Sequence, residues 1–152
     1  MKRFILIVLC LLLLPVYAST WVQIGDNSYI DKDNIRYYVN DYGNTDFYKK
    51  SFWIKLYNDN SDNFKEYEKI SDKKIKYIIY KNIIDFNKNS SSIKSTTMYD
   101  ENGNVIHSYT YKDYEIQWNS IIPDTIGEMW YELVKHPRML KKIYKQQQNY
   151  NK

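Results

Sequence analysis

The segment from Thr125 to Lys135 constrains the fold more than any other part of this chain, because it carries a helical repeat while the segments before it have the pattern of strands. Its apolar residues recur at the spacing of a single helical face. They are Ile126, Met129, Trp130, Leu133 and Val134. Thr125 and Glu128 have the spacing of a capping box, and Pro137 ends the segment. A helix this short is marginal alone, so we predict that its apolar side packs on a β-sheet.

The segments before this helix alternate apolar and polar residues, as strands with one buried face do. Phe52, Ile54 and Leu56, for example, fall on one face of a predicted strand. A second long strand is predicted over Lys73–Phe86, and Asp100–Gly103 has the Asn-Gly signature of a tight hairpin. We therefore predict the α+β class, with an antiparallel β-sheet of about six strands and one C-terminal helix packed on a face.

Three connecting segments carry expectations of their own. Residues 58–68 are polar and acidic, and we predict an exposed loop with a short helix at its end. The segment that crosses from the last strand to the helix is expected to be anchored by Trp118. One domain over residues 19–137 is followed by a basic and then polar tail, residues 138–152. Apolar residues in this tail have the spacing of a second amphipathic helix, but we expect the tail to fray into solvent.

Residues 1–18 have the physical parts of a secretory signal peptide. Lys2–Arg3 is the basic start, Phe4–Leu14 is an unbroken apolar run, and Ala18 is the small residue before a cleavage site. The run is too short to span a membrane, which takes roughly 20 apolar residues. An uncleaved anchor and a lipid on Cys10 are alternatives, although Leu9 stands where lipidation requires a small residue. We predict an exported protein with no stable membrane span after cleavage.

Removal of the signal peptide changes the balance of the composition. The 152-residue chain then retains 134 residues, enough for one domain to bury a core, and no cysteine. Its stability must come from that core, since no disulfide can form. The formal charge falls from +4 to +2, because the removed segment contains Lys2, Arg3 and no acidic residue. A nearly neutral chain has no general attraction for polyanions, so we predict no nucleic-acid partner.

Residues suited to acid–base or metal chemistry are sparse. His107 lies in a predicted strand and His136 at the end of the predicted helix, with no base-and-orienter pattern around either. The polar stretch from Asn58 has the length of a calcium loop, but Asn63 and Lys69 stand where a glycine and a bidentate glutamate are required. No glycine-rich phosphate loop is present. We predict that the protein is not an enzyme and has no catalytic residues, no metal site and no cofactor.

Lysines and tyrosines interleave in one basic stretch of the strand predicted over residues 73–86. The predicted partner-binding residues are Lys73, Lys74, Lys76, Tyr77 and Lys81. Such side chains can hold an acidic partner through charge and through the contact area of the tyrosine rings. The alternative is a solvated strand whose lysines prevent edge-to-edge aggregation. The residues alone leave both interpretations open.

Several blocks of the sequence resemble the surface-adhesin protein E family of Gram-negative bacteria. They are Trp21–Gly25, Tyr29–Asp31, Ser95–Gly103 and Trp118–Glu128. The resemblance spans nearly the whole mature chain and is most specific in the last block. It implies a small antiparallel sheet with a C-terminal helix, binding to host extracellular-matrix or serum proteins, and the ability to form a homodimer. Many members carry cysteines at places that fall near Phe86 and Lys135 here, so that disulfide is missing from this chain.

The resemblance and the export signal lead to a first hypothesis about function. It is a non-enzymatic, adhesin-like protein, associated with the outer membrane and cell surface or located in the periplasm, that binds host extracellular-matrix or serum proteins. The alternative is a periplasmic envelope protein that binds a small ligand or assists assembly, without host contact. Protease accessibility on intact cells separates the two hypotheses.

Overall fold

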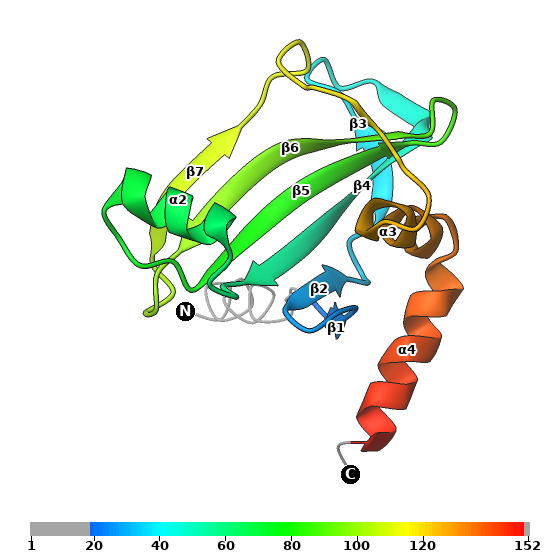
Figure 1. Ribbon diagram of the computed structural model, residues 1–152. Helices are drawn as coiled ribbons and strands as arrows, with labels where there is room; N and C mark the ends of the chain where they lie inside the picture. The colour runs from blue at the N-terminus through cyan, green and yellow to red at the C-terminus, as the bar shows by residue number, and fades with distance from the viewer. Residues whose placement is uncertain (1–18, 151–152) are drawn as a thin grey trace, which may run out of the picture.

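The computed structural model describes residues 19–150, in which eight antiparallel strands form one sheet accompanied by three helices (Figure 1). The strands are β1 (Trp21–Gln23), β2 (Ser28–Asp31), β3 (Arg36–Val39), β4 (Thr45–Tyr57), β5 (Tyr77–Asp85), β6 (Ser90–Tyr99), β7 (Val105–Thr110) and β8 (Asn119–Ser120). The helices are α2 (Asp62–Ser71), α3 (Ile126–Lys135) and α4 (Pro137–Tyr150). The predicted α+β class is confirmed. The predicted signal peptide lies outside the described residues.

The main path across the sheet has six strands, in the order β1-β2-β4-β5-β6-β7. Beside it, β3 pairs with β4 and β8 pairs with β6. The long strands β4, β5 and β6 form the centre, and their side chains alternate between the two faces. Phe52 and Ile54 of β4 are buried on one face, as predicted, and the register places Ile78 and Ile84 of β5 on the same face.

The described helices pack on that one face. α3 and α4 contribute Leu133 and Leu140 to a core cluster with the strands β1, β2 and β4. α2 contributes Phe64 to a second cluster, together with residues of β5 and β6. Leu56 contacts both clusters, so the core is continuous beneath the helices. Within the described part of the chain, the opposite face of the sheet carries no helix (Figure 1).

α3 forms where the sequence predicts it, but its first turn is held in another way. Thr125 is the N-cap residue and makes no side-chain capping bond. Its hydroxyl donates to the carbonyl of Ile122 at 2.6 Å instead. Glu128 accepts a hydrogen bond from the amide of Asp124 at 2.8 Å, one residue before the position that a capping box requires. The carboxylate of Glu128 still satisfies one amide at the start of the helix.

The apolar side of α3 is buried over only part of its length. Leu133 is 4% exposed and Val134 is fully buried. Trp130 packs edge-on against Phe52, with ring centres 6.5 Å apart. Ile126, at the first position of the predicted stripe, is 53% exposed. The contact with the sheet therefore begins at the second turn of the helix.

The connection between β4 and β5 differs from the predicted loop. Most of it forms α2, because Phe64 and Tyr67 give this segment an apolar side that packs on the sheet. The helix ends at Asp72, whose φ of 52° is left-handed. The chain then turns, and β5 begins at Tyr77, later than the predicted start at Lys73. The long strand predicted over residues 73–86 is correspondingly shorter.

Two expectations for the C-terminal part are wrong. Trp118 is 39% exposed and is no core anchor; the Nζ atom of Lys49 lies 5.6 Å from its ring centre. Ile121 is the residue of this crossing segment that enters the core. The tail also does not fray, because Leu140 is fully buried and holds α4 against the rest of the domain.

Candidate functional site

The structure distributes the predicted partner-binding residues over different surfaces. Lys73 lines a groove between α2 and the sheet. Lys74 and Lys76 border a separate hollow next to the end of β4. Tyr77 and Lys81 lie in β5, where the register directs their side chains to the helix-free face. Lys73, Lys74 and Lys76 lie in the connection between α2 and β5, so the five predicted residues do not share one strand.

On the helix-free face, a row of tyrosines crosses one end of the sheet. Tyr77 stacks on Tyr99 with ring centres 4.6 Å apart, and Tyr57 tilts against Tyr77 at 5.6 Å. The Nζ atom of Lys55 lies 4.2 Å from the ring centre of Trp21 and 5.4 Å from that of Tyr77. Burial lowers the pKa of Lys55. Since these rings pack against one another, the row stabilises the pairing of neighbouring strands.

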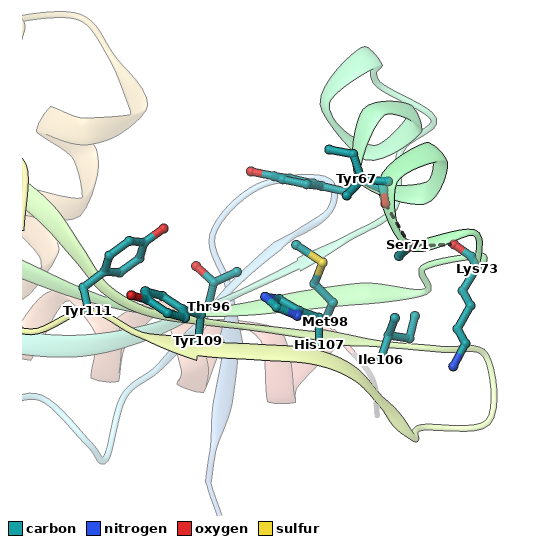
Figure 2. A pocket seen from close by; sticks show the side chains of 10 residues that line it. Tyr67, Ser71, Lys73, Thr96, Met98, Ile106, His107, Tyr109 and Tyr111 are labelled. Atoms are coloured by element: carbon teal, nitrogen blue, oxygen red, sulfur yellow. Dashed lines mark hydrogen bonds between the residues drawn. The ribbon is translucent and has the colours of Figure 1, made fainter. Parts of the chain in front are cut away.

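A groove of about 450 Å³ lies between α2 and the outer strands β6 and β7 (Figure 2). Tyr67 and Ile70 of α2 line one side of it, and Met98 of β6 lines the floor. His107 and Tyr109 of β7 line the other side. In Figure 2, Tyr67 extends from the helix above the groove while Tyr109 extends from the strand below. We take this groove as the candidate functional site.

The position of α2 beside the groove is fixed by several contacts. Phe64 is 6% exposed and packs with Ile78 of the sheet. The Oε1 atom of Glu68 accepts a hydrogen bond from the amide of Ile75 at 2.9 Å. It also accepts one from the side-chain amide of Asn58 at 3.1 Å. These bonds connect the segments before and after α2 to the helix itself. They fix the position of α2, which forms one wall of the groove.

The lining of the groove is made mostly of rings and alkyl groups. Lys73 and His107 are its ionisable side chains besides tyrosines, and no carboxylate is among the lining residues. The hydroxyl of Tyr109 donates to Glu115 at 3.3 Å, and the charge of Glu115 raises the pKa of Tyr109. Tyr109 is therefore a neutral phenol at ordinary pH. The groove suits apolar side chains, with an acidic group favoured near Lys73.

The histidines of the described chain stand apart from one another. His107 lines the groove, and His136 ends α3 with Glu132 3.5 Å away. Within residues 19–150, no three His, Cys, Asp or Glu side chains lie together in a way that could hold a metal ion. In the same part of the chain, no helix has the length and hydropathy needed to cross a membrane.

An ionic cluster, which we call the Lys94 cluster, joins the buried side chains of Lys94 and Tyr38 to the partly exposed carboxylates of Asp41 and Asp113. The Nζ atom of Lys94 lies 2.8 Å from Asp41 and 2.6 Å from Asp113. The hydroxyl of Tyr38 donates to Asp113. Lys94 and Asp41 are 53 residues apart, and Tyr38 and Asp113 are 75 residues apart, so no local sequence pattern could reveal the cluster. Its charged groups already bond one another, and we assign it a structural role.

Comparison with known proteins gives a likeness in fold only. No protein-family model matches this chain, and no curated protein matches it at a significant level. Solved structures of Haemophilus influenzae protein E are similar to it. The selenomethionine form has a TM-score of 0.49 and 17% identity, over 78% of this chain and 85% of that one. Crystal form II gives 0.48 and 15%, over 78% and 87%. Protein E from the non-typeable bacterium gives 0.43 and 16%, over 81% and 79%.

Proposed function

We propose that this chain is an exported, non-enzymatic protein of a bacterial envelope that binds host extracellular-matrix or serum proteins, as an adhesin does. The same proposal places it in the surface-adhesin protein E family. The observation that carries it is the groove between α2 and the outer strands, which is lined by rings and alkyl groups yet open along its rim. The export segment expected at residues 1–18 supports a location outside the cytoplasm.

Exposure along the rim of the groove favours a protein as the partner. Ile70 is 75% exposed and Tyr109 is 44% exposed, while Met98 on the floor is 7% exposed. Aromatic residues and methionine are enriched at the centres of protein interfaces. A partner that covers both rim residues must extend beyond the groove, as a protein surface does. Burying one isoleucine side chain contributes about 1.5–3 kcal/mol, so the rim can supply useful affinity.

The size of the groove favours a second candidate, a small ligand bound by a periplasmic envelope protein. Its volume of about 450 Å³ falls within the range of roughly 300–1,000 Å³ that is typical of small-molecule sites. Such sites bury most of the ligand surface, however. A ligand beside Ile70 would remain in contact with water along one side. We therefore place the protein partner first.

Ile70→Asp tests the groove without disturbing the core, because Ile70 is 75% exposed. We expect the mature chain to bind immobilised host matrix or serum proteins in surface plasmon resonance. The variant should bind at least about tenfold more weakly, since a charge replaces apolar contact in the interface. Ile122→Asp is the matched control, because Ile122 is 62% exposed and lies outside the groove. It should bind within about twofold of wild type.

The outcomes separate the candidates. An equal loss in the two variants would attribute the effect to added charge and remove the groove from the proposal. If the wild-type chain binds none of the host proteins, and protease added to intact cells leaves it fully protected, the adhesin role fails. The periplasmic candidate then takes its place. In that case, the Ile70→Asp variant should lose binding of a ligand in the groove, and the Ile122→Asp variant should keep it.

A further inference from the structure

β7 ends the main path of the sheet and is an unprotected edge. In residues 19–150 no strand pairs with its outer side, and all of its residues except Ile106 are exposed. Edge strands of stable monomers commonly carry proline, lysine or another charged residue. Val105–Thr110 contains no proline and no Lys, Arg, Asp or Glu. At the opposite edge, by contrast, Gln147 of α4 donates to the carbonyl of Gln23 in β1 at 2.8 Å.

The hydrogen-bond phase of the ladder shows which backbone groups of β7 face outward. The amide of Tyr111 donates to the carbonyl of Lys94 at 2.9 Å, directly beyond the last pair of the β6–β7 ladder. Bonded and non-bonded pairs alternate in an antiparallel ladder, so Tyr109 is bonded to β6 in the same way. Ser108 and Thr110 then direct their N–H and C=O groups away from β6. Outside this ladder, no described residue bonds to them.

The side chains beside this edge indicate what kind of segment would fit. His107 and Tyr109 line the groove, so a strand paired with β7 would place every second side chain on the same side, next to the exposed Ile70. The lining includes Lys73 and no carboxylate. Lys73 lies at the end of the groove where Ile106 is found (Figure 2). An acidic residue of the incoming segment is favoured at that end.

We propose that β7 binds an extended segment of the partner protein as an additional strand of the sheet. The segment pairs with the outward backbone groups of Ser108 and Thr110. Its alternate apolar side chains enter the groove beneath α2, and its acidic end lies beside Lys73. Unpaired donors and acceptors in strand geometry are complementary to a peptide backbone, which is the basis of strand addition in other domains. The inference deepens the proposed function and rests on it for the identity of the partner.

Ser108→Pro tests strand addition directly. Proline removes the outward N–H group, and edge positions whose N–H faces solvent tolerate it, so the ladder with β6 should remain intact. Ser108→Ala keeps the N–H group and is the matched control. Both are measured against a host protein that binds wild type, and by fluorescence anisotropy against a blocked peptide that alternates valine and threonine and ends in glutamate. The proline variant should bind at least about tenfold more weakly, and the alanine variant within about twofold of wild type.

Two further measurements keep the test decisive if Ser108→Pro does not fold. Thr110→Pro removes the other outward N–H group, and the peptide with N-methyl groups on alternate amides tests the wild-type chain without any substitution.

Equal binding of the proline and alanine variants overturns strand addition and leaves the proposed function standing. Peptide binding that is lost in Ser108→Pro, without binding to any host protein, supports strand addition and overturns the host partner. A wild-type dimer that Ser108→Pro converts to a monomer identifies a second copy as the occupant and overturns the choice of partner.

Discussion

At the scale of single residues, Lys94 is a buried charge whose state depends on distant partners. Its side chain is almost fully enclosed, at 6% residue exposure. Burial lowers the pKa of Lys94, but its hydrogen bonds to Asp113 and Asp41 outweigh that effect and raise the pKa above its ordinary value. Burial also raises the pKa of Tyr38 to about 12, with a further contribution from its hydrogen bond to Asp113. The lysine therefore stays charged and the tyrosine neutral at ordinary pH.

Lys94→Met should destabilise the fold by about 2–4 kcal/mol, because it keeps the length of the side chain but leaves Asp41 and Asp113 facing each other without a cation. The lower part of that range reflects the partial exposure of the carboxylates, 32% and 26%. Urea unfolding followed by circular dichroism measures the change. Lys88→Met, in an exposed turn, is the control and should change the free energy of unfolding by less than about 0.5 kcal/mol. A change of similar size in both variants would remove the Lys94 cluster from the account of stability.

At the scale of elements, α3 is held by its second and third turns. Trp130 packs against Phe52, while Ile126 at the first turn is half exposed. Trp130→Ala should therefore cost about 3–4 kcal/mol of unfolding free energy. Ile126→Ala, on the same apolar side of the helix, should cost less than about 1 kcal/mol. Denaturant melts compare the two, and a loss below about 1 kcal/mol for Trp130→Ala would contradict the packing of this helix.

The two C-terminal helices differ in how far the sequence could predict them. α3 carries its apolar residues at i, i+3 and i+4 spacing, and a short helix with such a stripe must be buried somewhere. α4 is basic and polar overall, but Leu140, Ile143 and Tyr144 lie at i, i+3 and i+4, and all three pack on the core. This spacing indicated an amphipathic helix, whereas its docking on the core was not expected. For Trp118 the error was the opposite one, since a residue predicted to anchor the segment is exposed. An aromatic residue in a crossing segment can lie beside a surface lysine, here Lys49, as well as in the core.

The candidate site was predictable only in fragments. Lys73 was predicted to bind a partner, and the structure places it in the lining of the candidate groove. The other predicted residues lie elsewhere, since their grouping depended on a strand that begins at Tyr77 and not at Lys73. The groove itself requires α2 to pack across β6 and β7, which is a long-range arrangement. Phe64, Tyr67 and Ile70 fall on one side of a helix over residues 62–71, and this spacing is the sequence signal for the wall of the groove.

At the scale of the whole molecule, the Lys94 cluster connects two turns that are distant in the chain. Lys94 binds Asp41 in the turn after β3 and Asp113 in the segment after β7. The hydrogen bond from Lys94 and the amide of Asp113 lower the pKa of Asp41. Burial raises the pKa of Asp113, but hydrogen bonds from Lys94 and Tyr38 outweigh it and hold the pKa below its ordinary value. Global stability is thereby linked to the charge on these carboxylates.

This linkage predicts that the stability of the fold depends on pH in the acidic range. A carboxyl group with a lowered pKa in the folded state stabilises the fold above its unfolded pKa of about 3.9, and that contribution is lost as pH falls through the folded value. We expect the free energy of unfolding to decrease below about pH 4. In the double variant Asp41→Asn/Asp113→Asn, the free energy of unfolding should fall less over the same pH interval than in wild type, because these two side chains no longer titrate. Urea melts at a series of pH values make the comparison, and parallel pH profiles would show that the cluster does not contribute.

The contact between α4 and β1 has a consequence for the order in which the molecule is made. Val22, near the start of the described chain, and Leu140, near its end, belong to the same core cluster, and Gln147 bonds to Gln23. The core therefore cannot close while the last helix is still inside the ribosome. Translation that stops before α4 yields a chain with an uncovered core. Until α4 has emerged, the chain remains open, which leaves time for the export proposed above to begin before the chain folds.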